Sequence, residues 1–306
     1  MNEKLAGRRL IIAHNPASSR AQKVRERVLE RLTRAGIAYE IFEIRQASLS
    51  ENVQALAARI RPNDLILSAA GDGSAHAIAH SVLAAGQPGV QLGFLAFGNF
   101  NDLAHTFNSH ATLRDPVKFL ERARVESLIP LEIRINDAPL RNALLYTTIG
   151  WTARAAARFD NPAIRRRLQT GEIGIVRNMA QLGMYYLHSR QQFLADFGAG
   201  RPISDILCIN GPVMARLFRT NKRLYKTPKF LVRRLDVSTL LPNMPFLLRS
   251  VFGKLPGERT TDLTLNFSAP STIPLQCDGE VLELDNVKKL EVRKATTRLA
   301  ILTTRR

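Results

Sequence analysis

A short acidic turn between an apolar stretch and an alanine-rich stretch is the part of this chain best suited to chemistry. Residues 68–76 read Ser-Ala-Ala-Gly-Asp-Gly-Ser-Ala-His. They follow Asp64-Leu-Ile-Leu67, which reads as a buried strand, and lead into a helix expected over 75–85. Glycine lets the backbone approach a phosphate closely, and the free N–H groups at a helix N-terminus bind anions. A carboxylate such as Asp72 fits among phosphates when a divalent cation lies between them. The turn therefore suggests a nucleotide, a metal and phosphoryl transfer, and the alternative is a plain turn in which Asp72 caps the helix.

Two further turns repeat this arrangement of strand, turn and helix. Residues 97–102, Phe-Gly-Asn-Phe-Asn-Asp, follow a strand expected over 91–96 and precede helix-like residues 103–107. Ligands bind at the carboxyl ends of parallel strands, so we expect Asp72 and Asp102 to face the same ligand. The first apolar run, 8–13, is followed by His-Asn-Pro-Ala-Ser-Ser-Arg, in which Ser18 and Arg20 can contact phosphate.

The strands and helices that must position these turns alternate regularly in the first part of the chain, and the pattern of the second part is different. Up to residue 127 the pattern of strand and helix is typical of a parallel sheet covered on both faces, and after Pro130 period-two alternation indicates antiparallel strands. We therefore expect an α/β domain over 1–129 with a parallel sheet, and a mainly antiparallel β-sandwich domain over 130–306, whose last strand can return to the first domain. The expected strands are 8–13, 39–44, 64–69, 91–96, 131–135, 144–149, 206–209, 263–267, 290–293 and 298–303, and the expected helices are 20–35, 50–60, 75–85, 115–123, 162–194 and 239–252.

Composition narrows the class of protein. The chain has 306 residues, enough for one large or two ordinary domains, and only two cysteines, Cys208 and Cys277. Two cysteines are too few for a disulfide framework or a metal cluster, which favours a reducing compartment. No apolar run approaches the roughly 20 residues that span a bilayer, and the N-terminus lacks a signal-peptide core. The sequence predicts a cytoplasmic protein and leaves peripheral membrane association open.

The positive charge is concentrated in the second half of the chain. The net charge is +18, and residues 154–254 hold 18 Lys/Arg against 5 Asp/Glu. Such a field attracts polyanions. An anionic membrane surface is the partner that we favour, and a solvated basic surface without a partner is the alternative. Nucleic acid is disfavoured because aromatic residues are sparse and are not interleaved with the basic ones. The oligomeric state stays open.

Four motifs resemble those of one known family. Asn15-Pro-Ala-Ser18, Ala70-Gly-Asp-Gly-Ser74, Gly98-Asn-Phe-Asn-Asp102 and Asp278-Gly-Glu280 fall in the order and spacing of the diacylglycerol kinase catalytic domain family. That superfamily includes soluble bacterial lipid kinases and sphingosine kinases, with the NAD kinases as more distant relatives. Ile149–Ala153 and Cys208–Ala215 also resemble a glycine-rich turn and an Asn-containing strand of the family, so the resemblance covers roughly residues 8 to 300.

The resemblance implies an ATP- and Mg²⁺-dependent kinase that phosphorylates a lipid hydroxyl, with diacylglycerol as the default substrate. It implies that Asp72 and Asp102 organise the metal and that Asp278 or Glu280 is the base for the attacking hydroxyl; the sequence does not separate these two acids. The remaining nucleotide contacts implied by the resemblance are Asn15, Ser18, Arg20, Gly71, Gly73, Ser74, Gly98, Asn99 and Asn101.

The motifs also depart from the family pattern. Ala70 replaces a glycine, which requires a negative φ at that position, and Ala77 replaces a glutamate. Asn99 replaces a threonine, and Phe100 places a ring where the family has a small residue. These departures motivate an alternative of a different class, a nucleotide- or lipid-binding pseudokinase of the same fold. An NAD-kinase-like activity is the alternative enzyme.

Overall fold

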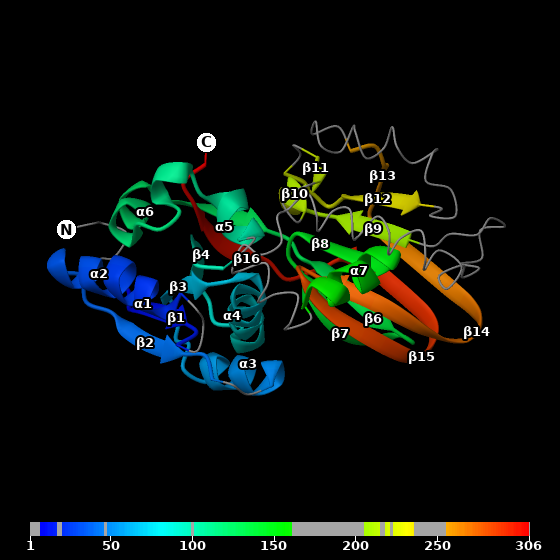
Figure 1. Cartoon of the computed structure of the whole chain (residues 1–306), viewed down its shortest axis with the longest axis horizontal. Helices are drawn as coiled ribbons and strands as arrows, with labels where there is room; N and C mark the ends of the chain where they lie inside the picture. The colour runs from blue at the N-terminus through cyan, green and yellow to red at the C-terminus, as the bar shows by residue number, and fades with distance from the viewer. Residues whose placement is uncertain are drawn as a thin grey trace. The chain divides into compact units, whose positions relative to one another are not determined.

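The structure is a computed structural model, and it describes residues 7–16, 20–45, 48–98, 101–160, 205–214, 218–220, 223–235 and 255–305. The chain divides into two compact units, Met1–Pro130 with Ala295–Arg306, and Leu131–Lys294 (Figure 1). Each unit has its own cluster of buried apolar side chains. The helices expected over 162–194 and 239–252 lie outside the described residues.

The first unit is built on a six-stranded sheet of order β2-β1-β3-β4-β16-β5. Its first five strands run parallel to their neighbours, and only β5 is antiparallel, against β16. β16 comes from the end of the chain and lies between β4 and β5, so the C-terminal segment completes the first sheet. The α/β class expected from the sequence is confirmed. The strands are β1 (Leu10–His14), β2 (Glu40–Glu43), β3 (Leu65–Ala70), β4 (Gln91–Ala96), β5 (Arg124–Leu128) and β16 (Leu299–Thr303).

Two helices of this unit, α3 and α6, begin at residues whose side chains cap them. Ser48 and Glu51 form a capping box at α3, and the Asp115 side chain accepts from Lys118 N at the start of α6. α4 begins at Asp72, three residues earlier than expected, because the glycine turn itself forms the first turn of the helix. The helices are α1 (Ala21–Val24), a π-helical turn (Arg25–Leu29), α2 (Glu30–Arg34), α3 (Leu49–Ala57), α4 (Asp72–Ala85), α5 (Asp102–Phe107) and α6 (Pro116–Arg122).

The second unit is built on an antiparallel sheet. Its described strands pair in the order β13-β12-β9-β8-β14-β15-β6-β7. One core cluster contains Ile133 of β6 and Val232 of β12, strands from opposite parts of this order, so the sheet curves around its own core. The antiparallel β-domain expected from the sequence is confirmed. The elements are β6 (Leu131–Ile135), β7 (Ala138–Ala143), β8 (Tyr146–Gly150), α7 (Trp151–Asp160), β9 (Asp205–Ile209), β12 (Phe230–Leu235), β13 (Glu258–Thr260), β14 (Asp262–Cys277) and β15 (Glu280–Lys294), with a separate pair, β10 (Val213–Met214) and β11 (Phe218–Arg219).

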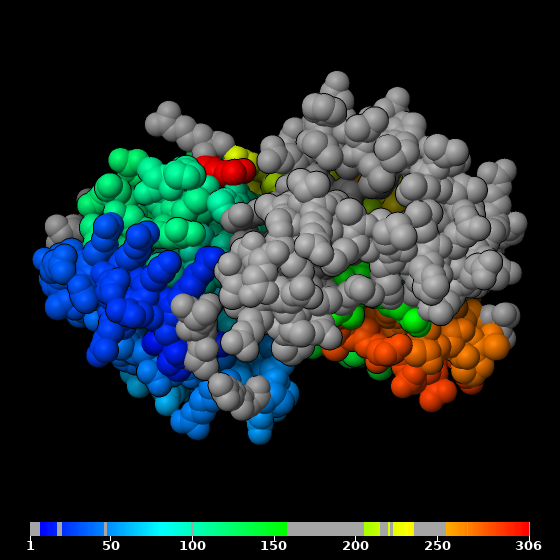
Figure 2. Space-filling view, in the orientation of Figure 1, coloured from blue at the N-terminus to red at the C-terminus, as the bar shows by residue number. Residues whose placement is uncertain are grey.

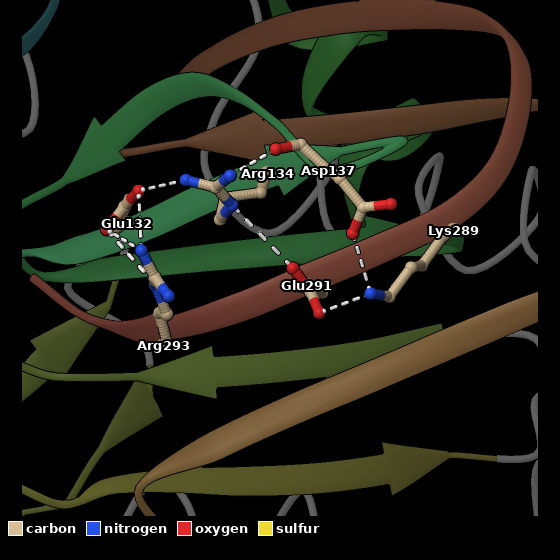
Figure 3. A network of polar contacts seen from close by, with 6 residues as sticks. All are labelled: Glu132, Arg134, Asp137, Lys289, Glu291 and Arg293. Carbon is tan, nitrogen blue, oxygen red and sulfur yellow. Dashed lines mark hydrogen bonds and ion pairs between the residues drawn. The ribbon is translucent and has the colours of Figure 1, made fainter.

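A network of alternating charges joins β6 and β15 of the second unit (Figure 3). Glu132 pairs with Arg293 at 3.0 Å, and Lys289 bridges Asp137 at 2.7 Å and Glu291 at 2.8 Å. Three acids face three bases, so this patch adds nothing to the net positive charge of the second half of the chain. The members are Glu132, Arg134, Asp137, Lys289, Glu291 and Arg293.

Lys294, at the end of β15, makes the stability of the second unit depend on pH. Its Nζ donates to Leu224 O at 2.9 Å and to Asn210 Oδ1, and burial lowers the pKa of the amine to about 7. Between this pKa and the ordinary value of 10.5, the unfolded chain binds a proton that the folded chain does not, so stability rises with pH across that window. We expect wild type to gain about 1–2 kcal/mol relative to Lys294→Met between pH 7 and pH 10, a range that allows for solvent screening.

Urea unfolding of both proteins across this pH range measures the gain. Lys289→Met is the matched control, because neighbouring acids raise the pKa of Lys289 and its contribution is constant below pH 10. If the free energies of unfolding of wild type and Lys294→Met changed equally with pH, the result would contradict the burial of the amine.

Candidate functional site

The glycines of the two acidic turns lie against each other in the first unit. A Cβ added to Gly98 would lie 2.3 Å from Gly71 Cα, and one added to Gly71 would lie 3.1 Å from Gly98 Cα. Gly71 has an ordinary extended backbone, with φ −83° and ψ 173°, so its conformation does not require glycine. The close approach of the two backbones explains why both positions are glycine. It also brings together the turns after β3 and β4, as the sequence predicts.

The Asp72 carboxylate fastens one turn to the other. It accepts a hydrogen bond from Asn101 N at 2.6 Å and a longer one from Leu103 N at 3.4 Å. It therefore caps α5 of the neighbouring turn, whereas its own helix α4 begins at Gly71 without a side-chain cap. The hydrogen bonds described for Asp72 therefore run to the neighbouring turn, a role that the sequence did not predict.

Asn101 shapes the second turn. Its backbone is left-handed, with φ 55°, a conformation that asparagine adopts more readily than most residues. The side chain folds back on Gly98, where Oδ1 accepts from the Gly98 N–H and Nδ2 donates to Gly98 O at 2.6 Å. Arg20, which precedes α1, also donates to Gly98 O. Three segments of the first unit thus meet at Gly98.

The first turn of α4 contains a glycine that the fold does not need. A Cβ added to Gly73 would meet no atom within 4 Å, and the residue is exposed. Glycine inside a helix destabilises it by about 0.5–1 kcal/mol relative to alanine. Open space therefore lies beside the first turn of α4 at Gly73, and the neighbouring Ser74 is half-buried.

The acids of these turns fit a magnesium ion that takes further ligands from phosphates and water. Asp72 is half-buried, and Asp102 is buried in the first turn of α5. No group of three or more His, Cys, Asp or Glu side chains gathers within the part of the chain that the structure describes. Mg²⁺ is commonly bound by one or two carboxylates with substrate phosphates and waters, so the absence of a larger cluster is compatible with it.

The remaining residues of the predicted nucleotide site are placed as follows. Asn15 follows β1 and is half-buried, whereas Ser18 and Asn99 lie outside the described residues. Ala70 is the last residue of β3 and has a negative φ, so this departure from the glycine motif is compatible with the backbone. Ala77 is buried in α4, and its methyl group provides no carboxylate.

In the second unit, the hairpin between β14 and β15 gives its two acids different surroundings. The Asp278 carboxylate is buried and accepts three backbone hydrogen bonds, from Leu144 at 2.5 Å, Leu145 at 2.8 Å and Tyr146 at 3.0 Å. Asp278 also adopts a left-handed conformation with φ 47°. Its carboxylate oxygens thus bind the backbone of the segment that leads into β8, which is the geometry of a structural anchor.

Glu280, by contrast, has a side chain that reaches solvent. Its Oε2 pairs with Arg141 Nη1 of β7 at 2.8 Å, and the side chain is 31% exposed. The Glu280 side chain as a whole is partly exposed although its Oε2 is buried beside Arg141, while the Asp278 carboxylate is enclosed by backbone. The two acids that the sequence left equivalent thus have different surroundings in the structure.

Two residues of the second unit were not foreseen from the sequence. Arg141 belongs to no motif, and its pairing with Glu280 depends on strand order in the sheet. Asp205, at the start of β9, accepts hydrogen bonds from the N–H and hydroxyl of Thr152. Burial raises the pKa of Asp205 to about 7, although the Thr152 hydrogen bonds oppose the shift. Its contacts hold the start of α7 on the sheet, and no local sequence signal identified it.

Comparisons with known proteins agree with this geometry. Residues 9–133 match the family model of the diacylglycerol kinase catalytic domain. No curated protein gives a match. Similar solved structures include a protein of Bacillus anthracis str. Sterne presumed to be a diacylglycerol kinase, with TM-score 0.65 and 12% identity over 96% of both chains. A diacylglycerol kinase of the same organism has TM-score 0.64 and 14% identity, again over 96% of both chains. The resemblance seen in the sequence is confirmed: residues 9–133 match the diacylglycerol kinase catalytic domain, and the chain shares the fold of these structures.

Proposed function

We propose that this protein is an ATP-dependent lipid kinase that phosphorylates a hydroxyl group, of the diacylglycerol type, on a lipid at an anionic membrane surface. The observation that carries the proposal is the contact between the glycine turns at Gly71 and Gly98, with Asp72 fastened to the second turn. The family match covers both turns. No helix in the described part of the chain is long and apolar enough to cross a bilayer.

In the proposed mechanism, the first unit binds the nucleotide. The open space at Gly73 admits a phosphate close to the N-terminus of α4, and Ser74 donates its hydroxyl to it. Arg20 neutralises phosphate charge beside Gly98. A bound Mg²⁺ would supply charge neutralisation between the phosphates, held by Asp72 and Asp102 directly or through water. Asp72 has a second task, since its hydrogen bonds keep the two turns in register.

The proposed base is Glu280. Phosphoryl transfer requires a group that accepts the proton of the attacking hydroxyl, and the group must be within reach of a substrate. Glu280 is partly exposed, and Arg141 fixes its position. Asp278, which the sequence offered as the alternative base, is assigned the role of holding the hairpin that presents Glu280.

One observation favours a second candidate, a nucleotide- or lipid-binding pseudokinase of the same fold. The position at which the family has a glutamate is occupied by Ala77, which is buried in α4. A protein without that carboxylate could bind nucleotide and lack transfer activity. ATP binding without phosphate transfer to any lipid would identify this function.

Replacing Glu280 by glutamine is expected to lower kcat for lipid phosphorylation by about 100-fold or more, because general-base catalysis contributes about 10²–10⁴-fold. The assay measures transfer from radiolabelled ATP, with Mg²⁺, to diacylglycerol, phosphatidylglycerol and a sphingoid base in mixed micelles. Glu283→Gln is the matched control, because Glu283 lies on the same strand, is 67% exposed, and is only loosely paired with Arg154. Its kcat should stay within about twofold of wild type.

The outcomes separate the candidates. Equal activity of Glu280→Gln and Glu283→Gln on a phosphorylated lipid would reject Glu280 as the base. Phosphorylation of NAD in place of lipids would support the NAD-kinase-like alternative. A wild-type protein that neither transfers phosphate nor binds ATP would reject the nucleotide site itself.

A further inference from the structure

A basic pocket opens beside the first helix of the chain, and it shares Arg20 with the proposed nucleotide site. It has a volume of about 170 Å³, and its lining comprises four cations and one aromatic ring: Arg20, Lys23, Arg27, Phe97 and Arg114. All five residues belong to the first unit. A pocket lined by four cations and no acid has a strong preference for an anion.

The first helical segment of the chain supplies three of the cations. Arg20 at the N-cap of α1, Lys23 in α1 and Arg27 in the π-helical turn all line the pocket, while Val24 and Val28 pack into the core. Like charges around one pocket repel one another, so the arrangement is unfavourable without a counter-ion. The N-terminal helices lie on the molecular surface, where a ligand can reach them (Figure 2).

The acids closest in sequence are engaged elsewhere. Asp115 pairs with Arg31 at 2.6 Å and caps α6. Glu26 accepts from Gln22 at 2.9 Å, and Glu30 pairs with Arg34 at 2.9 Å. Within the part of the chain that the structure describes, no acid pairs with Lys23, Arg27 or Arg114.

The fourth cation comes from the segment before α6. The Arg114 Nε donates to Ala96 O at 3.0 Å, which anchors the guanidinium next to Phe97. Phe97 is buried and closes the pocket with an apolar surface. At about 30 Å³ per water molecule in the liquid, the pocket volume corresponds to roughly six waters. This is enough for a phosphate group and a small part of the molecule that carries it.

We propose that Lys23, Arg27 and Arg114, together with Arg20, bind a phosphate group in this pocket. The planar forks of the arginines match phosphate oxygens better than they match a monovalent ion. Arg20 also donates to Gly98 O, so it joins the pocket to the turn after β4. The phosphate group can belong to a soluble compound or to a lipid headgroup.

The test measures phosphate binding without ATP. Inorganic phosphate is titrated into the whole protein by calorimetry, and Arg27→Gln is expected to weaken its affinity by about fivefold or more. Arg25→Gln is the matched control, because Arg25 lies two residues away in the same π-helical turn, is exposed, and does not line the pocket. Its affinity should change by less than about twofold. Equal weakening by both variants would overturn the proposal, since it would reveal a general effect of net charge.

A second arm identifies the source of the phosphate. Phosphatidylcholine vesicles with and without phosphatidic acid are offered to the same variants in a flotation assay. Selective loss of vesicle binding in Arg27→Gln indicates a lipid headgroup, and loss confined to inorganic phosphate indicates a soluble compound.

The phosphate-binding pocket can be tested independently of the proposed kinase activity. Gly73→Ala alters the proposed nucleotide site but lies outside the pocket lining. We expect this variant to bind inorganic phosphate as wild type does, even if it loses ATP. Loss of phosphate binding in Gly73→Ala would show that the phosphate occupies the nucleotide site, and it would overturn the separate pocket.

Discussion

Replacing Asp278 by asparagine is expected to lower the free energy of unfolding of the second unit by about 3 kcal/mol. The carboxylate accepts hydrogen bonds from the backbone N–H groups of Leu144, Leu145 and Tyr146, and all three residues are buried. Hydrogen bonds to a charged group contribute about 1.5–3 kcal/mol each, and an amide keeps one acceptor oxygen while its NH₂ faces a donor. Asparagine tolerates the left-handed backbone at φ 47°, so the substitution isolates the loss of the carboxylate.

Urea unfolding measures the effect. Asp285→Asn is the matched control because it removes the same charge from an exposed position on β15, where the side chain accepts from Thr272 at 2.8 Å. Its stability should change by less than about 0.5–1 kcal/mol. Wild-type stability in Asp278→Asn, combined with loss of kinase activity, would contradict the structural role and return Asp278 to the position of candidate base.

The different surroundings of Asp278 and Glu280 show what the sequence could not predict. Hydrophobic periodicity placed most strands of the two sheets, because burial on one face or two leaves a local pattern in the chain. It missed β5 in the first unit and β7, β12 and β13 in the second. The same local pattern gave the turns at Asp72 and Asp102, since each turn follows its own strand. The motif Asp278-Gly-Glu280 showed two acids at a hairpin. The choice of which acid is the candidate base depends on which of them is enclosed by backbone from another part of the chain. Leu144 lies 134 residues from Asp278 in the sequence, and the local sequence around either residue does not indicate the contact.

The role of Asp72 was hidden for a similar reason. A carboxylate at the start of a helix is the usual signal for a cap of that helix. Here the carboxylate instead caps α5, whose sequence begins 30 residues later, because the parallel sheet places β3 beside β4. The basic pocket is a further case: Arg114 joins Lys23 and Arg27 only through the packing of the segment before α6 against the first helix.

Replacing Gly98 by alanine is expected to abolish most nucleotide-dependent activity and to destabilise the first unit by about 1–3 kcal/mol. The new methyl group would lie 2.3 Å from Gly71 Cα and 3.1 Å from Asn101 Oδ1, and the nearest atom belongs to backbone that cannot rotate away. The two turns must therefore separate, at the energetic cost typical of an overpacked site. Separation also breaks the alignment of Asp72 with the turn after β4, and a misplacement of about 1 Å at a catalytic site lowers the rate by roughly 100-fold.

The matched variant is Gly73→Ala, in which the added methyl group meets no protein atom. It should stabilise the first unit by about 0.5–1 kcal/mol, since alanine is the better helix residue. Isothermal titration with ATP and Mg²⁺ then distinguishes the reason for each glycine. If phosphates lie beside α4, Gly73→Ala binds ATP more weakly despite its greater stability, whereas Gly98→Ala loses both affinity and stability. A Gly98→Ala protein with wild-type stability and wild-type affinity for ATP would contradict the contact between the turns, and with it the observation on which the proposed kinase depends.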